Sequence, residues 1–362
     1  ENSYKTINKN CPSCGSFLHF LPNKQNLGCS NCHAEVELEF PQSLEKRAFD
    51  FQNQGKVYSV ESSVSCSSCG ATSVFEAGIE AGSCAYCASP ITKNKTDFNT
   101  TIHPDNILSF RLTQEQAQNK IKDWIHGLWF APNKLKTTYK NKDKLKGCYL
   151  PYWNFDAKSY TSYVGERGTY YYVTKTRTVT VNGQTKTETY QERKIRWTTV
   201  SGSVRNTFVD VLVPAQKSLE PHLLDELGSW GLGRSKQFKE EALLGFQAMS
   251  ASTTLQQGVV DAHNIMKEVI YSTIKRDIGG DEQRITSTDI DWSDEKFNQI
   301  LLPIWIGAYL FSNKVFRICV NGDTGVVDGE RPYSWIKIFF FSTFVLGVVG
   351  SALYWAHQNG LL

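Results

Sequence analysis

The sequence lacks the short motifs that mark the common nucleotide-dependent and hydrolytic enzymes. It has no GxxxxGK[ST] loop for nucleotide phosphates, no HExxH, no GxSxG and no kinase signature. The glycine-rich stretch at residues 231–236 is too short for a phosphate loop, and the seven histidines are scattered. Because no nucleophile stands near a base in the sequence, we predict that the protein is not an enzyme. A deep polar pocket with convergent titratable groups would indicate the alternative.

The chain also lacks a strong excess of either charge. It has 39 Lys and Arg against 36 Asp and Glu, a net charge of +3 in 362 residues, so composition alone favours no polyanionic partner. The polar opening, Glu-Asn-Ser-Tyr-Lys-Thr, predicts no signal peptide. The length predicts two or more domains of about 100 to 200 residues each.

The cysteines form a repeated pattern. Eight of the ten belong to two copies of one frame, in which two CxxC pairs are separated by fourteen residues, and the copies are offset by 55 residues. They are Cys11, Cys14, Cys29 and Cys32, and then Cys66, Cys69, Cys84 and Cys87. A CxxC turn directs two thiolates at one metal ion, and the glycine that follows, Gly15 or Gly70, tolerates positive φ. We therefore predict two zinc sites, each with four thiolate ligands.

Four thiolates leave zinc no open position for water, so both predicted sites are structural. Each short ribbon has little core of its own, and zinc at roughly 10–16 kcal/mol per site would fold it. The alternatives are disulfides in a secreted domain, for which adjacent CxxC pairs are poorly suited, or a chance spacing. We interpret His33 as a bystander. Zinc thiolates indicate a reducing compartment, and Cys148 and Cys319 are predicted to be ordinary buried thiols.

The C-terminal segment predicts a membrane helix. Residues 338–355, IFFFSTFVLGVVGSALYW, contain no charged side chain. At 1.5 Å per residue they cover about 27 Å, close to the roughly 30 Å of a hydrocarbon core. Arg331 and Lys337 precede the segment, so we predict a single pass with the body in the cytoplasm and the tail outside the cell membrane. Aromatic residues flank both ends, as in an interfacial belt: Tyr333, Trp335, Tyr354 and Trp355. The alternative is a buried core helix.

Between the cysteines and this segment, the pattern predicts both helices and strands. Thr113 and Gln116 form a capping box before an apolar helical stripe that ends at Pro132. The stripe, expected in the core, comprises Ala117, Ile121, Trp124, Ile125, Leu128 and Trp129. A second amphipathic helix is predicted over residues 255–277, with Gly279-Gly280 closing it. Asn182-Gly183 predicts the turn of a long polar hairpin that projects from the body, with arms at 170–180 and 185–197.

Further strands are predicted on both sides of the second helix. Residues 149–155 and 301–307 share the frame LPxW, which suggests two related strand entries in one sheet. A short strand is predicted over 209–213, a loop over 228–236, and strands over 301–327 around a turn at Asn321-Gly322-Asp323.

These features together predict an α+β fold class. The chain is expected to contain two N-terminal four-cysteine zinc ribbons, a mainly antiparallel α+β body with a long β-hairpin, and one C-terminal transmembrane helix. The predicted boundaries are 1–40 for the first ribbon, 41–60 for a linker, 61–93 for the second ribbon, 94–334 for the body and 335–357 for the transmembrane helix.

Residues 134–146 are rich in lysine, with only Asp143 to oppose the charge. A solvated loop is one interpretation, and attraction to anionic lipid headgroups, at roughly 1 kcal/mol per Lys, is the other. Nucleic acid would meet the same charges, but the interleaved Arg and aromatic residues that favour base contacts are missing. The lysines are Lys134, Lys136, Lys140, Lys142, Lys144 and Lys146.

Several blocks, in their order along the chain, resemble a bacterial family of membrane-anchored double zinc-ribbon proteins. The blocks are CPSCG, CSSCG, YLPYWNFDA, GERGTYYYV, FVDVLVPA, LLPIW, VNGDTGVVDGERPYSWIKI and the terminal apolar segment. This family carries the labels "TFIIB-type zinc ribbon" and "primosomal protein N-prime, helicase-like", although no motor motif supports the second label here. The resemblance implies a cytoplasmic body on one membrane helix. For members similar to the YdjG type, it implies work with PspA-like and flotillin-like SPFH proteins in envelope stress.

We therefore expect a non-enzymatic, membrane-anchored adaptor that recruits or assembles protein partners, as a homo-oligomer or hetero-oligomer. The alternative is a nucleic-acid-binding zinc-ribbon protein tethered to the membrane. Between Cys11 and Cys32 the only Lys or Arg is Lys24, and between Cys66 and Cys87 there is none. Because phosphate contacts dominate nucleic-acid affinity, ribbons this poor in cations favour the adaptor.

Overall fold

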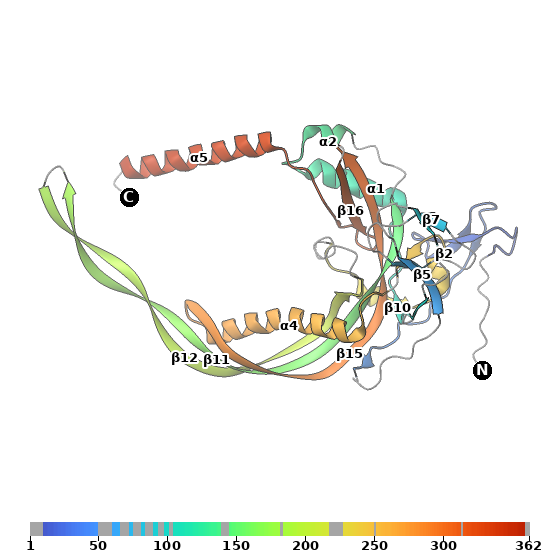
Figure 1. Cartoon of the computed structure of the whole chain (residues 1–362), viewed down its shortest axis with the longest axis horizontal. Helices are drawn as coiled ribbons and strands as arrows, with labels where there is room; N and C mark the ends of the chain where they lie inside the picture. Colours follow the sequence, from blue (N-terminus) through green and yellow to red (C-terminus); the bar gives the residue numbers. More distant parts are fainter. Residues whose placement is uncertain are drawn as a thin grey trace.

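A computed structural model of the chain contains a long curved sheet attached to a mixed body of helices and strands (Figure 1). The structure describes residues 10–49, 60–65, 72–74, 81–83, 90–92, 98–100, 104–138, 145–181, 184–216, 227–249, 251–312 and 314–358. The predicted mixture of α and β structure is confirmed, with a cysteine cluster near the N-terminus and an apolar helix at the C-terminus. The predicted domain boundaries stay a prediction.

The strands before the first helix are short. They are β1 (Leu18–Leu21), β2 (Asn26–Cys29), β3 (Glu35–Val36), β4 (Arg47–Ala48), β5 (Val60–Ser65), β6 (Thr72–Val74), β7 (Ala81–Ser83), β8 (Pro90–Thr92), β9 (Phe98–Thr100) and β10 (Asn106–Ile107). Helices α1 (Gln114–Gly127) and α2 (Asn133–Thr138) follow, and then the long strands β11 (Lys146–Val181) and β12 (Gln184–Pro214).

The second half of the chain completes the sheet and ends in a helix. Its short elements are η1 (Leu232–Arg234), β13 (Lys236–Gln237), η2 (Glu240–Leu243) and β14 (Gln247–Ala248). They are followed by helix α4 (Leu255–Ile278), the long strand β15 (Glu282–Phe311), strands β16 (Lys314–Asn321) and β17 (Val327–Gly329), and helix α5 (Trp335–Gln358).

The three long strands form the centre of the main sheet in the order β12-β11-β15, and β11 is antiparallel to both neighbours. The register places Leu150 opposite Leu302 and Pro151 opposite Leu301, so the two LPxW segments lie side by side in one sheet as predicted. The second segment does not open a strand, however, because β15 begins at Glu282. The strand predicted over 209–213 is confirmed and ends at Pro214, but it is only the last part of the longer strand β12. The apolar side chains before it, Val200, Val204 and Phe208, are separated by Gly202 and Asn206, so the regular apolar alternation that marks a strand is missing there.

The pairing of β11 shifts register at three places, and at two of them a β-bulge holds an aspartate at positive φ. Asp210 of β12 and Asp294 of β15 have positive φ values of 58° and 50°, and both stand where the pairing shifts beside residues 155–158 of β11. A bulge bends its strand and increases the local twist. The sheet therefore curves away from the body, and α4 lies along its concave side (Figure 1).

Helix α4 is capped at both ends, and the sequence analysis predicted the glycine that ends it but not its N-cap. The Thr254 side chain accepts a hydrogen bond from the N–H of Gln257, and Gly279 ends the helix with a φ of 66°. Its apolar stripe is buried against the sheet: Val259, Ala262, Met266, Ile270, Ile274 and Ile278. Gly258 allows close approach, because a Cβ added there would lie 2.7 Å from Cδ1 of Trp153. The predicted second helix is confirmed.

Helix α1 begins with the predicted capping box between Thr113 and Gln116. Ala117, Ile121 and Ile125 are buried as expected. The helix ends at Gly127, five residues before the expected end at Pro132, so Trp129 lies outside it. Trp129 is 73% exposed, and its assignment to the core was wrong. The helical phase that would have turned it inward is lost once the chain leaves the helix.

Helix α5 extends from the body and contacts it near its start, where the ring of Phe341 lies against Trp129 and Phe130. None of its residues is buried, and its mean hydropathy of 2.0 over 18 residues makes it long and apolar enough to cross a membrane. The alternative of a buried core helix does not fit this exposure. At its start the Lys337 ammonium donates hydrogen bonds to the carbonyls of Trp129 and Ala131 and to Asn133 Oδ1.

Candidate metal centre

The first cysteine frame folds into two turns with the same backbone pattern. In one turn the N–H of Gly15 donates to the carbonyl of Cys11 at 2.8 Å, and the N–H of Cys11 donates to Ser16 at 2.7 Å. The other turn repeats the pattern at the equivalent positions. The N–H of His33 donates to the carbonyl of Cys29 at 3.1 Å, and the N–H of Cys29 donates to the carbonyl of Ala34 at 3.0 Å. Each turn therefore presents its two thiols from one tight loop.

The position after each CxxC has a left-handed backbone. Gly15 has a φ of 75°, as the sequence predicted, and His33 has a φ of 59° at the equivalent place. A non-glycine residue at positive φ is uncommon, and histidine is among the residues that tolerate it better. His33 therefore has a backbone role in the turn that the sequence analysis missed. The Cys-His dipeptide at the position of Cys-Gly was the available signal.

The four side chains converge. The Sγ atoms of Cys11, Cys14, Cys29 and Cys32 all lie within 4.8 Å of one another, with 3.5 Å between Cys11 and Cys32 and 3.5 Å between Cys14 and Cys29. A tetrahedral zinc with Zn–S bonds of about 2.3 Å separates its sulfurs by about 3.8 Å, whereas a disulfide requires about 2.05 Å. All four cysteines are free thiols, so the spacing fits a metal and excludes disulfides among them.

The thiols cannot all ionise together in the absence of a metal. Hydrogen bonds from the side chain and the backbone of Ser16 lower the pKa of Cys14 to about 5. The backbone N–H of Ala34 lowers the pKa of Cys32. The hydrogen bonds of the Cys32 thiol with Cys14 and Cys11 outweigh this effect and raise the pKa of Cys32 to about 12. A metal-free four-thiol site is expected to hold a thiolate beside a thiol that keeps its proton. A bound divalent cation would supply the positive charge that allows the remaining thiols to ionise.

The cluster is built on a three-stranded antiparallel sheet, β1-β2-β3, in which Leu18 pairs with Cys29. Cys11 and Cys29 are buried, whereas Cys14 and Cys32 are exposed. The cluster thus has one side toward the interior and one toward solvent. Its only Lys or Arg between the outer cysteines, Lys24, forms an ion pair with Glu35 of β3.

Residues from the body complete the core of this sheet. Phe20 is 2% exposed, and its ring contacts Phe40 and Phe246 at centroid distances of 6.4 Å each. Its N–H donates to the carbonyl of Leu244, and Leu244 is buried in the same hydrophobic cluster. Phe246 in turn stacks on Phe110 of the body core at 4.3 Å. The cysteine cluster is therefore joined to the body core through aromatic side chains from a region more than 200 residues away.

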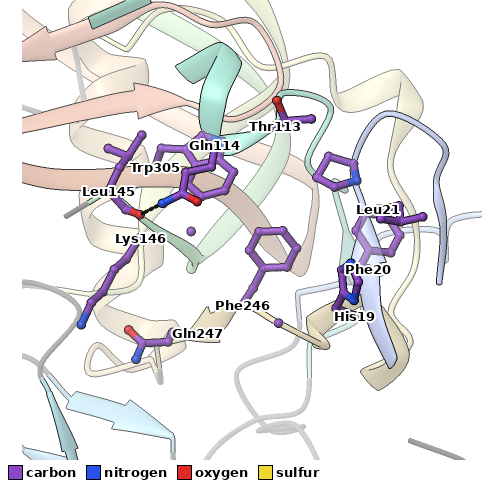
Figure 2. Close-up of a pocket in the computed structure, with 13 residues that line it drawn as sticks. His19, Phe20, Leu21, Thr113, Gln114, Leu145, Lys146, Phe246, Gln247 and Trp305 are labelled. Atoms are coloured by element: carbon purple, nitrogen blue, oxygen red, sulfur yellow. Dashed lines mark hydrogen bonds between the residues drawn. The ribbon is translucent and has the colours of Figure 1, made fainter. Parts of the chain in front are cut away.

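A cleft of about 440 Å³ lies where this sheet meets the body. Figure 2 shows Phe246 within it, with His19 and Phe20 on one side and Trp305 on the other. Gln114 donates a hydrogen bond to the carbonyl of Leu145 along its edge. The lining mixes aromatic, aliphatic, amide and glycine residues, and no pair of nearby titratable side chains in it resembles a nucleophile and its base.

The other predicted cysteines are placed differently. Cys66, Cys69, Cys84 and Cys87, together with Gly70, lie outside the described residues, so the second zinc site stays a prediction. Cys148 and Cys319 are buried in the body as predicted, and neither belongs to the cysteine cluster found among the described residues. Burial raises the pKa of Cys319 to about 12, so this thiol stays protonated at neutral pH.

The lysine-rich stretch is described only at its ends. Lys134 and Lys136 belong to α2, and Lys146 begins β11, while Lys140, Lys142 and Lys144 lie outside the described residues. Lys136 donates to the carbonyl of His126 at the end of α1. Lipid attraction by this stretch stays a prediction.

The chain is 22% identical over 333 residues to the uncharacterized protein YdjG of Bacillus subtilis (strain 168), and the similarity covers 92% of each chain. This is a distant relationship that extends over nearly the whole of both proteins. No family model matches the sequence, and no solved structure matches it.

Proposed function

We propose that the protein is a non-enzymatic, membrane-anchored zinc-binding adaptor that recruits or assembles partner proteins on the cytoplasmic side of the membrane. The observation that carries this proposal is a closed four-thiol cluster joined to the body core in a chain whose last helix is apolar and has no buried residue. Four protein ligands leave a bound metal no position for a substrate. Zinc would thus stabilise a surface, and α5 would hold that surface at the bilayer.

The orientation follows from the charges next to α5. Arg331 and Lys337 precede the apolar stretch, and only His357 follows it, which supports a cytoplasmic body and an external tail. Trp335 is 80% exposed at one end and Trp355 is 63% exposed at the other, in positions suited to the two membrane interfaces.

Crossing a bilayer requires α5 to change its angle to the body. In Figure 1, α5 and the long sheet leave the body on the same side and run alongside one another. A bilayer perpendicular to α5 would then contain the outer part of the sheet, whose exposed charged side chains, such as Lys186, Lys194 and Asp289, are costly to bury in hydrocarbon. Residues 330–334, which form neither helix nor strand, are the point at which α5 would turn, and the turn would break the hydrogen bonds from Lys337 to Trp129, Ala131 and Asn133.

The partners that we propose are the membrane-remodelling PspA-like and flotillin-like SPFH proteins implied by the family resemblance, in envelope stress. Nucleic acid is less favoured. The first cysteine cluster offers one Lys, and Glu35 neutralises it, so the cluster has no free cation for a phosphate.

The experiment that tests the proposal is purification of the full chain from membranes, with zinc and co-purifying proteins measured on the same sample. We expect about two zinc ions per chain, membrane-remodelling or SPFH-type partners, and loss of membrane association when residues 335–362 are deleted. Recovery of the intact chain in the soluble fraction would refute the anchor. Nuclease-sensitive nucleic acid in place of protein partners would favour the alternative.

A further inference from the structure

The long hairpin extends beyond the strand that supports it. β15 begins at Glu282, opposite Gly168, so residues 169–181 of β11 and 184–196 of β12 continue as a two-stranded ribbon, here called the distal ribbon. Figure 1 shows it projecting past α4 and past the end of β15. A two-stranded ribbon has no core and is marginally stable alone in water. An arm of this kind gains stability when a partner supplies another strand.

The distal ribbon is basic. It contains six Lys and Arg and two Glu, a net charge of +4. The two Glu are engaged within the ribbon, since Glu192 pairs with Lys175 and Glu188 pairs with Arg177. The remaining cations have no carboxylate partner among the described residues, and all are exposed: Lys186, Arg193, Lys194 and Arg196. The ribbon therefore presents uncompensated positive charge along β12.

The same chain carries an acidic sheet edge. Residues 282–294 of β15 pair with β11 on one side, and no described strand pairs with their other side. This edge contains four acidic residues and Arg284, a net charge of −3. Asp294 is paired with Lys158, but Asp289 and Asp291 are exposed and have no cationic partner among the described residues. An unpaired strand edge is a template for a strand of another chain.

The charges on the two surfaces have the same spacing. Lys194 and Arg196 are two residues apart on β12, and Asp289 and Asp291 are two residues apart on β15. Residues i and i+2 of a strand lie on the same face, so one register would place both cations beside both acids, whether the strands run parallel or antiparallel. Within one chain the two surfaces cannot pair this way, because β11 lies between β12 and β15.

We propose that copies of this chain associate head to tail, with the distal ribbon of one copy adding as strands to the β15 edge, residues 282–294, of the next. The two surfaces differ, so the contact is heterologous and propagates into a chain of copies or closes into a ring. This inference rests on the proposed scaffold function and names a second copy of the protein as one of its partners. Anchoring by α5 would confine such copies to one membrane surface.

Two charge-reversed variants test the contact in the full chain, carried one copy per nanodisc of neutral phosphatidylcholine so that α5 helices cannot meet. One variant reverses the edge, Asp289→Lys with Asp291→Lys, and the other reverses the ribbon, Lys194→Glu with Arg196→Glu. Each variant alone should associate with itself about tenfold or more weakly than the unmodified chain, because like charges then face each other. An equal mixture of the two should recover association, because each variant's ribbon then meets an edge of opposite charge.

The control for the edge variant has the same change in net charge at exposed acidic residues of the helices, Asp123→Lys with Glu268→Lys, and should associate normally. A photoreactive residue at Gln191, in mixed isotope-labelled and unlabelled copies, should crosslink to a peptide from residues 282–296 of the other copy. An unmodified chain that stays monomeric, or a mixture that does not recover, would overturn the proposal. So would crosslinks to anionic lipid or nucleic acid instead of protein.

These variants leave the cysteines and α5 unchanged. Their zinc content and membrane association should therefore equal those of the unmodified chain. If the copies do not associate but zinc binding and membrane association are intact, only the proposed self-association is refuted. A chain that is soluble and binds no zinc would instead refute the adaptor.

Discussion

Replacement of Phe20 by alanine tests whether the body holds the first cysteine cluster in place. The Phe20 side chain is buried between Phe40 and Phe246, and both ring contacts are lost on truncation. Truncating a buried phenylalanine to alanine costs about 3–5 kcal/mol. We expect the free energy that keeps β1, β2 and β3 folded against the body to fall by this amount. The substitution removes no residue from the hydrophobic clusters of the body itself.

The same loss should be visible in metal binding. Folding and metal binding are coupled in a small four-thiol site, so a loss of folding energy lowers the apparent metal affinity. At about 1.4 kcal/mol per factor of ten, 3–5 kcal/mol corresponds to an affinity roughly 100- to 4000-fold weaker. None of the four ligands is altered by the substitution, so a fall of this size measures the support that the body gives to the site.

The assay is competition between the protein and a zinc chelator, in a Cys66→Ser, Cys69→Ser background that removes the second frame. Phe17→Ala is the matched control, because Phe17 lies beside the same strand but is 76% exposed. We expect the control to change the affinity by less than about twofold, in keeping with the small effects of exposed sites. Equal effects of the two substitutions would refute the docking of the cluster on the body.

Two further predictions address the ligands and the sheet. Cys32 retains its proton at neutral pH in the metal-free cluster, where its pKa is raised to about 12, so zinc has to displace at least one proton. The apparent zinc affinity should therefore rise about tenfold per pH unit between about pH 6 and 8 and fall on acidification; a chelator titration that gives a pH-independent affinity would contradict this. Gly258→Ala should destabilise the protein by about 1–3 kcal/mol in urea unfolding, because the added Cβ would lie 2.7 Å from Trp153. Gly127→Ala should be neutral or stabilising, because a Cβ added at Gly127 would meet no other part of the protein within 4 Å. Equal changes in unfolding free energy for the two variants would contradict this reasoning.

The features that could be predicted from the sequence depend on short-range spacing. The first CxxC frame, the capping box at Thr113, the closing Gly279 and the apolar helix at the C-terminus each involve residues that are close in the chain. Their geometry is set by the local backbone, so a pattern of a few residues is sufficient. The same reasoning failed at Trp129, where the helix ended earlier than its apolar spacing indicated.

The long strands show where short-range patterns are insufficient. β12 and β15 each continue through stretches with few apolar residues, and those present, such as Val204 and Trp292, are too widely spaced to give the alternation that distinguishes strand from loop. Only pairing with β11 makes them strands, and for β15 this pairing joins residues more than 100 positions apart, such as Leu150 and Leu302. The bulges at Asp210 and Asp294 likewise depend on the partner strand.

The sequence by itself determined the chemistry of the candidate site: four thiols, their spacing and the closed coordination that they offer to a metal. Only the tertiary structure decided what surrounds that site. Leu244 and Phe246 complete its core from the other half of the chain, and their contact with Phe20 follows from the path of the whole sheet. Ligand spacing is fixed by covalent geometry over a few bonds, whereas packing between distant segments is fixed only when the complete fold buries them together.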